Sequence, residues 1–448
     1  MEFPNPGTGS EGQQMNSTIL KSLGSIHRYS WVSLLVCWLI WVINAYDREI
    51  ILRLGPSISK SFDLSPDAWG VIAALIMLSL AVMPIPGSAM SDKYGGGEKR
   101  AKFQVPLVIG MAVLSFVSGL KFISHNIVLF FALRFGVNLG AGWGEPVGVS
   151  NTAEWWPKER RGFALGAHHT GYPIGSLLSG IMAAAVLSWF GPEGWSYAFF
   201  LAIIVAVPVM LFWAKYSTRD KIVTLYKDFD AKGLTRPDAI ENLQGHAKGL
   251  LKRTVTTPAI TVTAVTTLLT QIVYMGVNTV LPPYLYNIVG LSLAESAGLS
   301  VVFALTGIFG QIIWPTLSDR IGRRPTIIIC GVWMAVSVAA LYFATTSLLV
   351  VIVQLVFGLV ANAVWPIYYA AASDSAPDGG TSTANGVITT AMFIGGGIAP
   401  VLIGRLVTMG GGWEASSGYV YCFLTMAGFA LLGALVQAFV KQPSKLGV

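Results

Sequence analysis

The chain has 448 residues, of which 54% are hydrophobic and only 11% are charged, and its formal net charge is +7. Soluble domains carry about 25% charged residues, so this composition excludes an ordinary soluble enzyme or binding module. It predicts an all-α polytopic membrane protein.

A polar tail precedes the first apolar segment. It begins MEFPNPGTGSEGQQMN and has no features of a cleavable signal peptide, so we expect it to be retained. Twelve apolar blocks follow, each long enough to cross a hydrocarbon core about 30 Å thick, which requires about 20 helical residues. The blocks are 30–54, 68–90, 103–123, 126–150, 161–189, 195–215, 257–287, 292–317, 325–344, 346–371, 384–408 and 418–440.

The twelve expected helices divide into two six-helix halves, because one long polar segment interrupts the series. The expected parts are a tail at 1–27, a first half at 28–215, a linker at 216–256, a second half at 257–440 and a tail at 441–448. A short motif repeats between the halves, since SDKYG at 91–95 and SDRIGRRP at 318–325 start 227 residues apart. Parallel repeats of this kind are typical of transporters whose substrate site lies near the membrane midplane between the repeats.

The basic residues predict the orientation. If alternate connections lie on opposite sides, 23 of the 29 Lys and Arg residues fall on one side. The positive-inside rule then places both termini and the linker in the cytoplasm of a cell whose inner (plasma) membrane holds the protein. This asymmetry explains the net charge, so we expect the lipid bilayer and no nucleic acid as the partner of the basic residues.

The first apolar block ends in an unusual run of charges. In WVINAYDREIILRL, residues 41–54, Asp47, Arg48 and Glu49 are consecutive. A charge near the bilayer centre costs roughly 2.5–3.5 kcal/mol, so we expect these charges to have a function. An arginine offers a fork of donors matched to a carboxylate, and a partly desolvated aspartate can take up a proton. The alternative is a simple internal Asp47–Arg48 ion pair, while Glu49 and Arg53 have the spacing of a structural pair.

Polar side chains in later blocks are further candidates for the substrate site. Adjacent His168 and His169 lie within the fifth block, and because they point about 100° apart, at most one is expected to face a cavity. The alternative for each is an ordinary interhelical hydrogen bond. Polar and aromatic residues also share one face of the seventh and one face of the tenth expected helix, although such stripes can equally reflect packing. They are Gln271, Tyr274 and Asn278, and Asn362, Trp365 and Tyr369.

The paired loops at 91–95 and 318–325 resemble those of the major facilitator superfamily, a fold of twelve transmembrane helices in two pseudo-repeats. In that family the loops act as cytoplasmic gates, where acidic residues meet arginines and helix termini. The resemblance implies gating or structural roles for Asp92, Arg134, Arg160, Asp319, Arg320, Arg323 and Arg324. The first loop departs from the pattern, because three glycines precede Glu98.

Within that superfamily, the chain is similar to the anion:cation symporter family. The similar stretches are INAYDREI at 43–50, EWWPKERRGFALG at 154–166, VLPPYL at 280–285, and APDGGTSTANG with GGGIAPVLIG at 376–404. The resemblance implies proton coupling at Asp47 and anion binding at Arg48, with Tyr46 of the same motif at the substrate. The family commonly carries a glutamate seven residues after Arg134, where this chain has Ala141. Glu145, one turn further on, either replaces that acid or braces its helix.

These observations predict a proton-coupled symporter for a small organic anion such as a sugar acid, a dicarboxylate or an aromatic carboxylate. An exchanger or facilitator without proton coupling is the second hypothesis, and a membrane-embedded enzyme or sensor is the third. No catalytic motif supports the third. Cys37, Cys330 and Cys422 lie inside apolar blocks and indicate neither a disulfide nor a metal site. We therefore expect a monomer without metal or cofactor.

Overall fold

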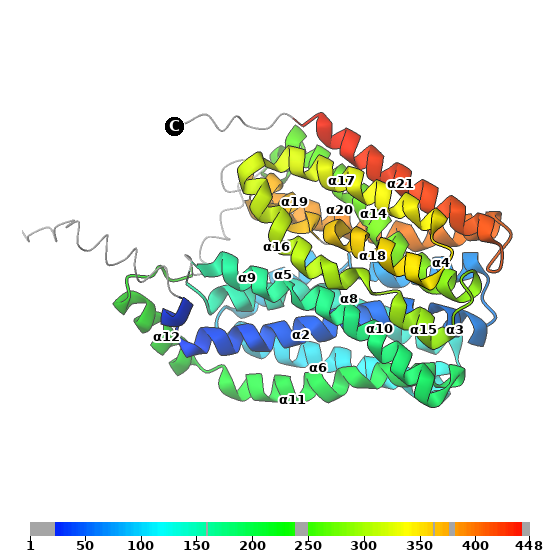
Figure 1. The fold of residues 1–448 in the computed structure, drawn as a ribbon. Coiled ribbons are helices and arrows are strands. Elements are labelled where there is room, and N and C mark those ends of the chain that lie inside the picture. Colours follow the sequence, from blue (N-terminus) through cyan, green and yellow to red (C-terminus); the bar gives the residue numbers. More distant parts are fainter. Residues whose placement is uncertain (1–22, 158–159, 238–249, 362, 376–380, 441–448) are drawn as a thin grey trace, which may run out of the picture.

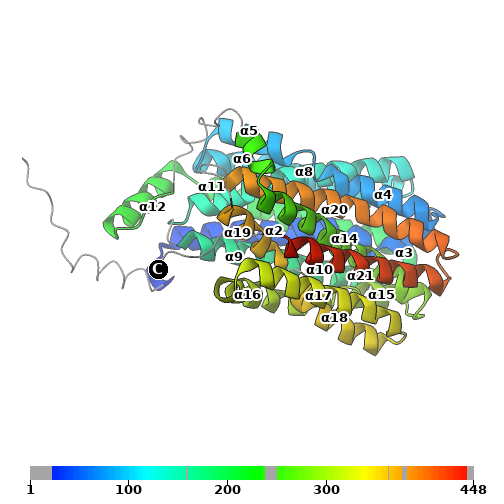
Figure 2. The ribbon, with the colours of Figure 1, turned by 90° about the horizontal axis from the view of Figure 1, so that it is seen from above.

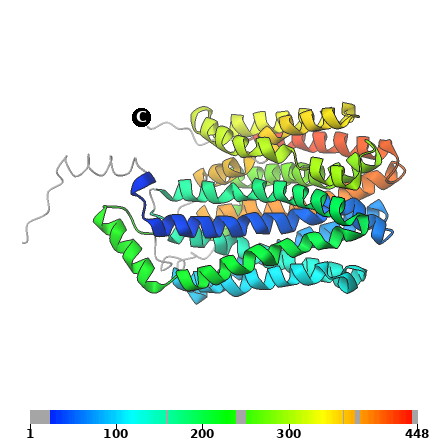
Figure 3. The same cartoon turned by 60° about the horizontal axis from the view of Figure 1, so that its bottom comes forward.

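The protein is a bundle of helices in two layers. The computed structural model describes residues 23–157, 160–237, 250–361, 363–375 and 381–440, and the regular secondary structure of these residues is helical. The amino-terminal half forms one layer and the carboxy-terminal half forms the other, as Figures 1 and 3 show. The described ends of the chain lie at the same end of the bundle, on the left in Figure 1.

The described part of the first half consists of α-helices and short 3-10 helices. They are η1 (Leu23–Ser25), α2 (Arg28–Arg53), α3 (Gly55–Ser61), α4 (Pro66–Ser79), α5 (Pro84–Tyr94), α6 (Glu98–Gly119), α7 (Lys121–Ser124), α8 (Ile127–Glu154), α9 (Arg161–His169), α10 (Gly171–Phe190), η3 (Pro192–Phe200) and α11 (Leu201–Tyr216).

The second half repeats this plan after the linker helix α12 (Arg219–Ala231). Its elements are α13 (Leu250–Val255), α14 (Pro258–Asn287), α15 (Leu293–Leu299), α16 (Phe303–Ile321), α17 (Arg323–Ala340), η5 (Leu341–Phe343), α18 (Ser347–Ala361), α19 (Val364–Asp374), α20 (Thr381–Met409) and α21 (Ser416–Ala438).

The number of membrane spans agrees with the sequence except at the second block. Among the described residues, eleven helices are long and apolar enough to cross a membrane, or twelve if the bent pair α3 and α4 is one span. The expected span 68–90 is divided into α4 and α5, neither of which is long enough alone. Pro84 and Pro86 lie at the start of α5, and proline lacks the N–H that would continue the helical hydrogen bonds.

Part of the linker is packed against the first half. The sequence predicted only a polar connection at 216–256, but α12 forms within it and buries Ile222, Leu225 and Phe229. These side chains join a cluster with Trp155 and Trp213 under the first half. The spacing of three and four residues places all three on one face of the helix. This amphipathic helix was not predicted, because the segment as a whole is polar.

The two halves are in close contact at the end of the bundle remote from the chain termini, which we call the sealed end. There α4 and α20 lie side by side (Figure 2). A Cβ atom on Gly70 would be 2.5 Å from the carbonyl oxygen of Pro400, and one on Gly404 would be 2.3 Å from that of Pro66. Trp413 Nε1 also donates to the Leu64 carbonyl at 3.0 Å. Only glycine allows the two backbones to approach this closely.

Gly404→Ala is therefore expected to weaken the sealed end. Overpacking costs about 1–3 kcal/mol, enough to reduce the population of the sealed conformation at least five-fold. Spin labels at Lys60 and Glu414, one on each half, should report a longer mean distance in the variant. Gly110→Ala is the matched control, because nothing lies within 4 Å of a Cβ added there. An unchanged distance distribution in Gly404→Ala would show that this contact does not hold the halves together.

Candidate functional site

The charged run of α2 is divided among three environments. Consecutive residues on a helix point about 100° apart, and Asp47, Arg48 and Glu49 accordingly face three different groups of helices. All three are buried, with exposed fractions of 3%, 8% and 1%. Each therefore needs its own partner.

Asp47 is paired with Arg134 of α8, and the Asp47–Arg48 ion pair considered as an alternative is not formed. Arg134 Nη1 donates to Asp47 Oδ1 at 3.1 Å, and Ser115 Oγ donates to the same oxygen at 2.7 Å. The Arg134 guanidinium lies 4.5 Å from the ring centroid of Phe199. The interpretation of Asp47 and Arg48 as mutual partners was wrong because the helical rotation directs Asp47 into the first half and Arg48 toward the second.

Arg48 lies in a cavity between the two halves. This central cavity is formed by α2, α4 and α10 from the first half and α14 and α20 from the second. It is lined by Arg48, Glu49, Met77, Leu80, Tyr172, Gln271, Met275, Phe393 and Gly396. Residues from both halves meet here, as expected for a site that changes when the halves move.

The Arg48 guanidinium is held by one carboxylate and three aromatic rings. Its Nη1 donates to Glu145 Oε2 of α8 at 3.2 Å. The guanidinium carbon lies 5.9, 5.5 and 5.8 Å from the ring centroids of Trp41, Tyr172 and Phe393. Cation–π contacts of this kind stabilise a desolvated guanidinium. Among the described residues this is the one hydrogen bond that the guanidinium makes, so four of its five N–H donors remain available.

Glu49 is the one acid among the residues that line the central cavity, and its charge is balanced by Arg53. Its Oε2 accepts a hydrogen bond from Arg53 Nη2 at 2.6 Å, and its Oε1 accepts one from the Tyr172 hydroxyl at 2.6 Å. The expected Glu49–Arg53 pair is thus formed. Arg53 also donates to the side-chain and main-chain oxygens of Asn278, on α14 of the second half. This pair therefore joins the two halves next to the cavity.

The remaining surface of the central cavity is mostly apolar. Met77, Leu80, Met275 and Phe393 contribute carbon and sulfur atoms, and Gly396 contributes backbone. Gln271 supplies an amide whose Oε1 has no hydrogen-bond partner among the described residues. A bound molecule would therefore meet one arginine, one free amide, the hydrogen-bonded pair Glu49 and Tyr172, and a mostly apolar wall.

Several predicted substrate residues lie elsewhere. Tyr46 is fully buried inside the first half, where its hydroxyl donates to the Ala198 carbonyl. Asn278 is occupied by Arg53, and Tyr274 packs edge-on against Phe303 and Trp365. In this conformation other helices cover the faces of α2 and α14 that carry these residues, and their assignment to the substrate site stays a prediction.

Of the tenth-helix candidates, Asn362 lies outside the described residues. Trp365 and Tyr369 are half-buried on α19, and the Tyr369 hydroxyl is hydrogen-bonded to Thr389 Oγ1 at 3.0 Å. Neither residue lines the central cavity. Of the described members of the two predicted stripes, Gln271 alone lines it.

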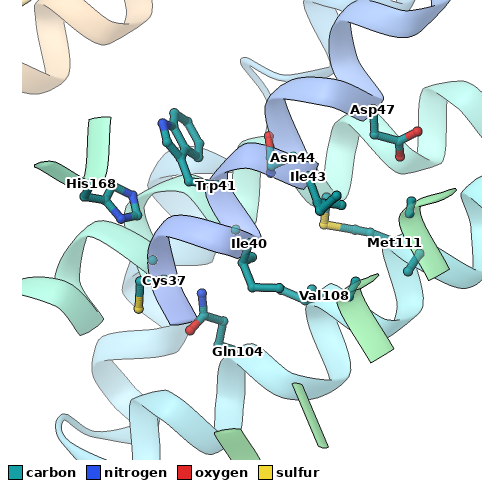
Figure 4. A pocket seen from close by; sticks show the side chains of 15 residues that line it. Cys37, Ile40, Trp41, Ile43, Asn44, Asp47, Gln104, Val108, Met111 and His168 are labelled. Carbon is teal, nitrogen blue, oxygen red and sulfur yellow. The ribbon is translucent and has the colours of Figure 1, made fainter. Parts of the chain in front are cut away.

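The two histidines of α9 differ in environment. His168 is 1% exposed and lines a second cavity, inside the first half, that Figure 4 shows. His169 is half-buried, and its Nδ1 lies 2.8 Å from the Leu165 carbonyl oxygen. As expected, they do not share one surface. Neither is among the residues that line the central cavity.

The repeated loops form equivalent polar clusters in the two halves. In the second half, Arg323 Nη1 donates to Ser318 Oγ at 2.5 Å and Arg323 Nε to Asp374 Oδ2 at 3.4 Å. In the first half, Arg100 bonds Ser91 Oγ at 2.8 Å and Glu154 Oε1 at 3.0 Å.

The sequence reading missed Arg100 and Glu154 as the counterparts of Arg323 and Asp374. Arg323 directly follows Gly322, whereas four residues, Gly96 to Lys99, separate Arg100 from the aligned Gly95, which obscures the correspondence. Of the other predicted gate residues, Arg324 donates to the Ala438 carbonyl, Arg160 is half-buried at the start of α9, and Arg320 is exposed. The side chains of Asp92 and Asp319 lie outside the described residues.

The cavity residues Tyr172, Met77, Leu80, Met275 and Phe393 were also missed. All but Tyr172 are apolar residues in apolar helices, and nothing in such a segment distinguishes a cavity wall from a packed surface. Only Tyr172 could have been suspected from the sequence, since it follows the two predicted histidines by one helical turn.

The comparisons with known proteins agree with this geometry. The profile of the Major Facilitator Superfamily matches residues 37–262 and 263–447. A cis,cis-muconate transport protein of Acinetobacter baylyi is 23% identical over 420 residues, covering 93% of this chain and 96% of that protein. A hexuronate transporter of Bacillus subtilis is 24% identical over 429 residues, covering 91% and 94%. The solved structure of a bacterial homologue of the human lysosomal transporter Spinster, inward-facing and occupied, superposes with a TM-score of 0.70 at 16% identity, covering 92% of this chain and 97% of that one.

Proposed function

The chain belongs to the Major Facilitator Superfamily, so it is a multi-pass secondary transporter and not an enzyme, and we propose that it imports a small organic anion together with a proton. The expected fold is confirmed by the two matched halves and by the likeness to solved transporters of this fold. In the proposed cycle, the halves 28–215 and 257–440 of a monomer rock about the linker. The basic loops support a cytoplasmic position of the chain termini, and in the proposed orientation the sealed end faces outward.

The single observation that supports an anionic substrate is the position of Arg48. Its guanidinium lies in a cavity formed by both halves, where only Nη1 is engaged among the described residues. The remaining donors form a planar fork that suits a carboxylate. Surrounding rings and apolar side chains exclude water, which strengthens such a contact.

The cavity wall favours an anion with a flat, apolar body over a sugar acid. A sugar acid carries several hydroxyl groups, and each one buried without a partner costs roughly 1–3 kcal/mol. The wall offers Gln271 and few other free polar groups, while Met77, Leu80, Met275 and Phe393 suit unsaturated or aromatic carbon. Of the two relatives, the one described as a muconate transport protein fits this chemistry better than the one described as a hexuronate transporter.

The Arg48–Glu145 pair supports proton coupling. An ionised Glu145 competes with the substrate carboxylate for the same guanidinium, whereas a protonated Glu145 releases it. Proton binding and anion binding then favour each other, and this reciprocity is what linkage requires of a symporter. Of the two roles considered for Glu145, its position at 3.2 Å from Arg48 Nη1 favours the functional one.

Uptake by proteoliposomes tests the proposal. An inward proton gradient should drive the accumulation of muconate or a benzoate-type acid, an uncoupler should abolish it, and glucuronate should be accumulated at least ten-fold less. Uptake that ignores the uncoupler but requires internal anion would identify an exchanger instead. A preference for glucuronate would refute the assignment of the apolar wall to the substrate body.

A further inference from the structure

A second cavity lies within the first half, beside α2. Its walls come from α2, α6, α8, α9 and α11. Figure 4 shows that Asp47 and His168 mark opposite ends of it, with Asn44 between them. We call it the inner cavity. No residue lines both this cavity and the central cavity, although Trp41 of the inner cavity also contacts the Arg48 guanidinium.

The inner cavity contains buried polar atoms that lack protein partners. Asn44 and His168 are 7% and 1% exposed, and neither Asn44 Oδ1 nor His168 Nε2 has a hydrogen-bond partner among the described residues. The other ring nitrogen of His168 lies 3.3 Å from Thr152 Oγ1, which leaves Nε2 directed elsewhere. An unsatisfied buried polar group costs about 1–3 kcal/mol. Buried water normally satisfies such groups where the cavity is large enough to hold it.

His168, Asn44 and Asp47 lie at regular intervals along α2. The His168 ring is stacked on Trp41 with the ring centroids 5.6 Å apart, so the two residues lie at the same level of α2. Asn44 is three residues beyond Trp41, and Asp47 is three residues beyond Asn44. At 1.5 Å per residue, each step is about 4.5 Å along the helix and the whole path is about 9 Å. Two or three hydrogen-bonded water molecules would bridge this distance.

We propose that the inner cavity is a hydrated path that carries protons from the His168 end to Asp47 without passing through the substrate cavity. Asn44 and His168 are positioning residues that hold its water. The proposal rests on the proton-driven uptake proposed above, and it adds Asp47, paired with Arg134, as a second acid that takes up a proton besides Glu145. The path begins at α9, two turns from the end of the bundle where the chain termini lie.

Proton transfer along this path changes the packing of the first half. An O–H bond of a hydronium ion breaks as an O–H bond forms on the Asp47 carboxylate, leaving a neutral acid and a water molecule. Arg134 of α8 is the charged group that faces Asp47, while Ser115 of α6 contributes a hydroxyl. Loss of the aspartate charge weakens the link between α2 and α8. His169 and Cys37 are the titratable groups beside His168, and the path needs no charge on the imidazole.

X-ray hydroxyl-radical labelling of the intact protein in detergent tests hydration directly, because it marks side chains next to buried water. Cys37 and Met111 line the inner cavity, whereas Cys330 and Met334 are equally or more deeply buried and line neither cavity. Cys37 and Met111 should be oxidised several-fold faster than Cys330 and Met334, respectively. Equal rates within the two pairs would show a dry cavity and overturn the proposal. This measurement needs no variant.

Transport by variants tests the path itself. Asn44→Leu and His168→Leu should slow proton-driven uptake about ten-fold and shift its pH profile, while substrate affinity and substrate exchange remain normal. Asn44→Ser and His168→Gln keep hydrogen-bonding groups and should restore much of the rate.

Asn138→Leu is the matched control, since this buried amide of α8 lines neither cavity and should leave proton-driven uptake unchanged. Normal uptake in both leucine variants would refute the path. Uptake by the unmodified protein that ignores the gradient would refute the proposed symport, and the labelling would still report whether the cavity is wet.

Discussion

Replacing Arg48 with lysine should weaken substrate binding by roughly ten- to hundred-fold, although the positive charge is retained. Hydrogen bonds to charged groups contribute about 1.5–3 kcal/mol, and each 1.4 kcal/mol is a factor of ten in affinity. A lysine ammonium is a point charge that cannot form two parallel bonds to a carboxylate. It would also lose the planar contact with the three rings around the guanidinium. Calorimetric titration of the purified protein measures this difference.

The matched control for this experiment is Arg236→Lys. Arg236 is half-exposed in the linker, where it pairs with Asp230 of the same segment. Surface pairs of this kind contribute about 0–1 kcal/mol, so this variant should bind the substrate normally. If Arg48→Lys bound with unchanged affinity, the anion would not be held by a forked contact at this residue.

Replacing Glu145 with glutamine should abolish both the pH dependence of substrate binding and accumulation against a gradient. In the unmodified protein, affinity should rise as pH falls, because protonating Glu145 releases Arg48 for the substrate. Glutamine imitates the protonated acid at every pH, so the variant should bind tightly throughout. At pH 8 its affinity should exceed that of the unmodified protein by about five-fold or more, as expected for a coupling of 1–3 kcal/mol. Binding measured between pH 5.5 and 8 and uptake into proteoliposomes give the two readouts.

The same kind of substitution at Asp47 is not an equivalent experiment. Asp47→Asn leaves Arg134 fully buried without its carboxylate partner, and breaking a buried pair in this way costs about 3–5 kcal/mol. A transport defect in that variant must therefore be compared with its thermal stability. If Glu145→Gln kept the pH dependence of the unmodified protein and still accumulated substrate, Glu145 would not be the coupling acid, and Asp47 would become the leading candidate.

The sequence by itself determined the membrane fold of this protein. Apolar segments of about 20 residues can satisfy their backbone hydrogen bonds inside a bilayer only as helices, so composition and block length sufficed to predict the spans. The repeat of SDKYG and SDRIGRRP was enough to predict two equivalent halves. The cost of burying charge also identified the end of α2 as functional, because such a cost must be offset by partners.

Only the tertiary structure decided which partner each charge has. Asp47 and Arg134 are 87 residues apart, Arg48 and Glu145 are 97 apart, and Arg53 and Asn278 are 225 apart. Consecutive side chains on α2 point in directions that differ by about 100°, so each one meets whichever helix packs on its side. That packing depends on how ridges and small residues of many helices fit together, and no local pattern in the chain records it. The inner cavity could not be predicted from the sequence for the same reason, because the five helices that line it come together only when the first half folds.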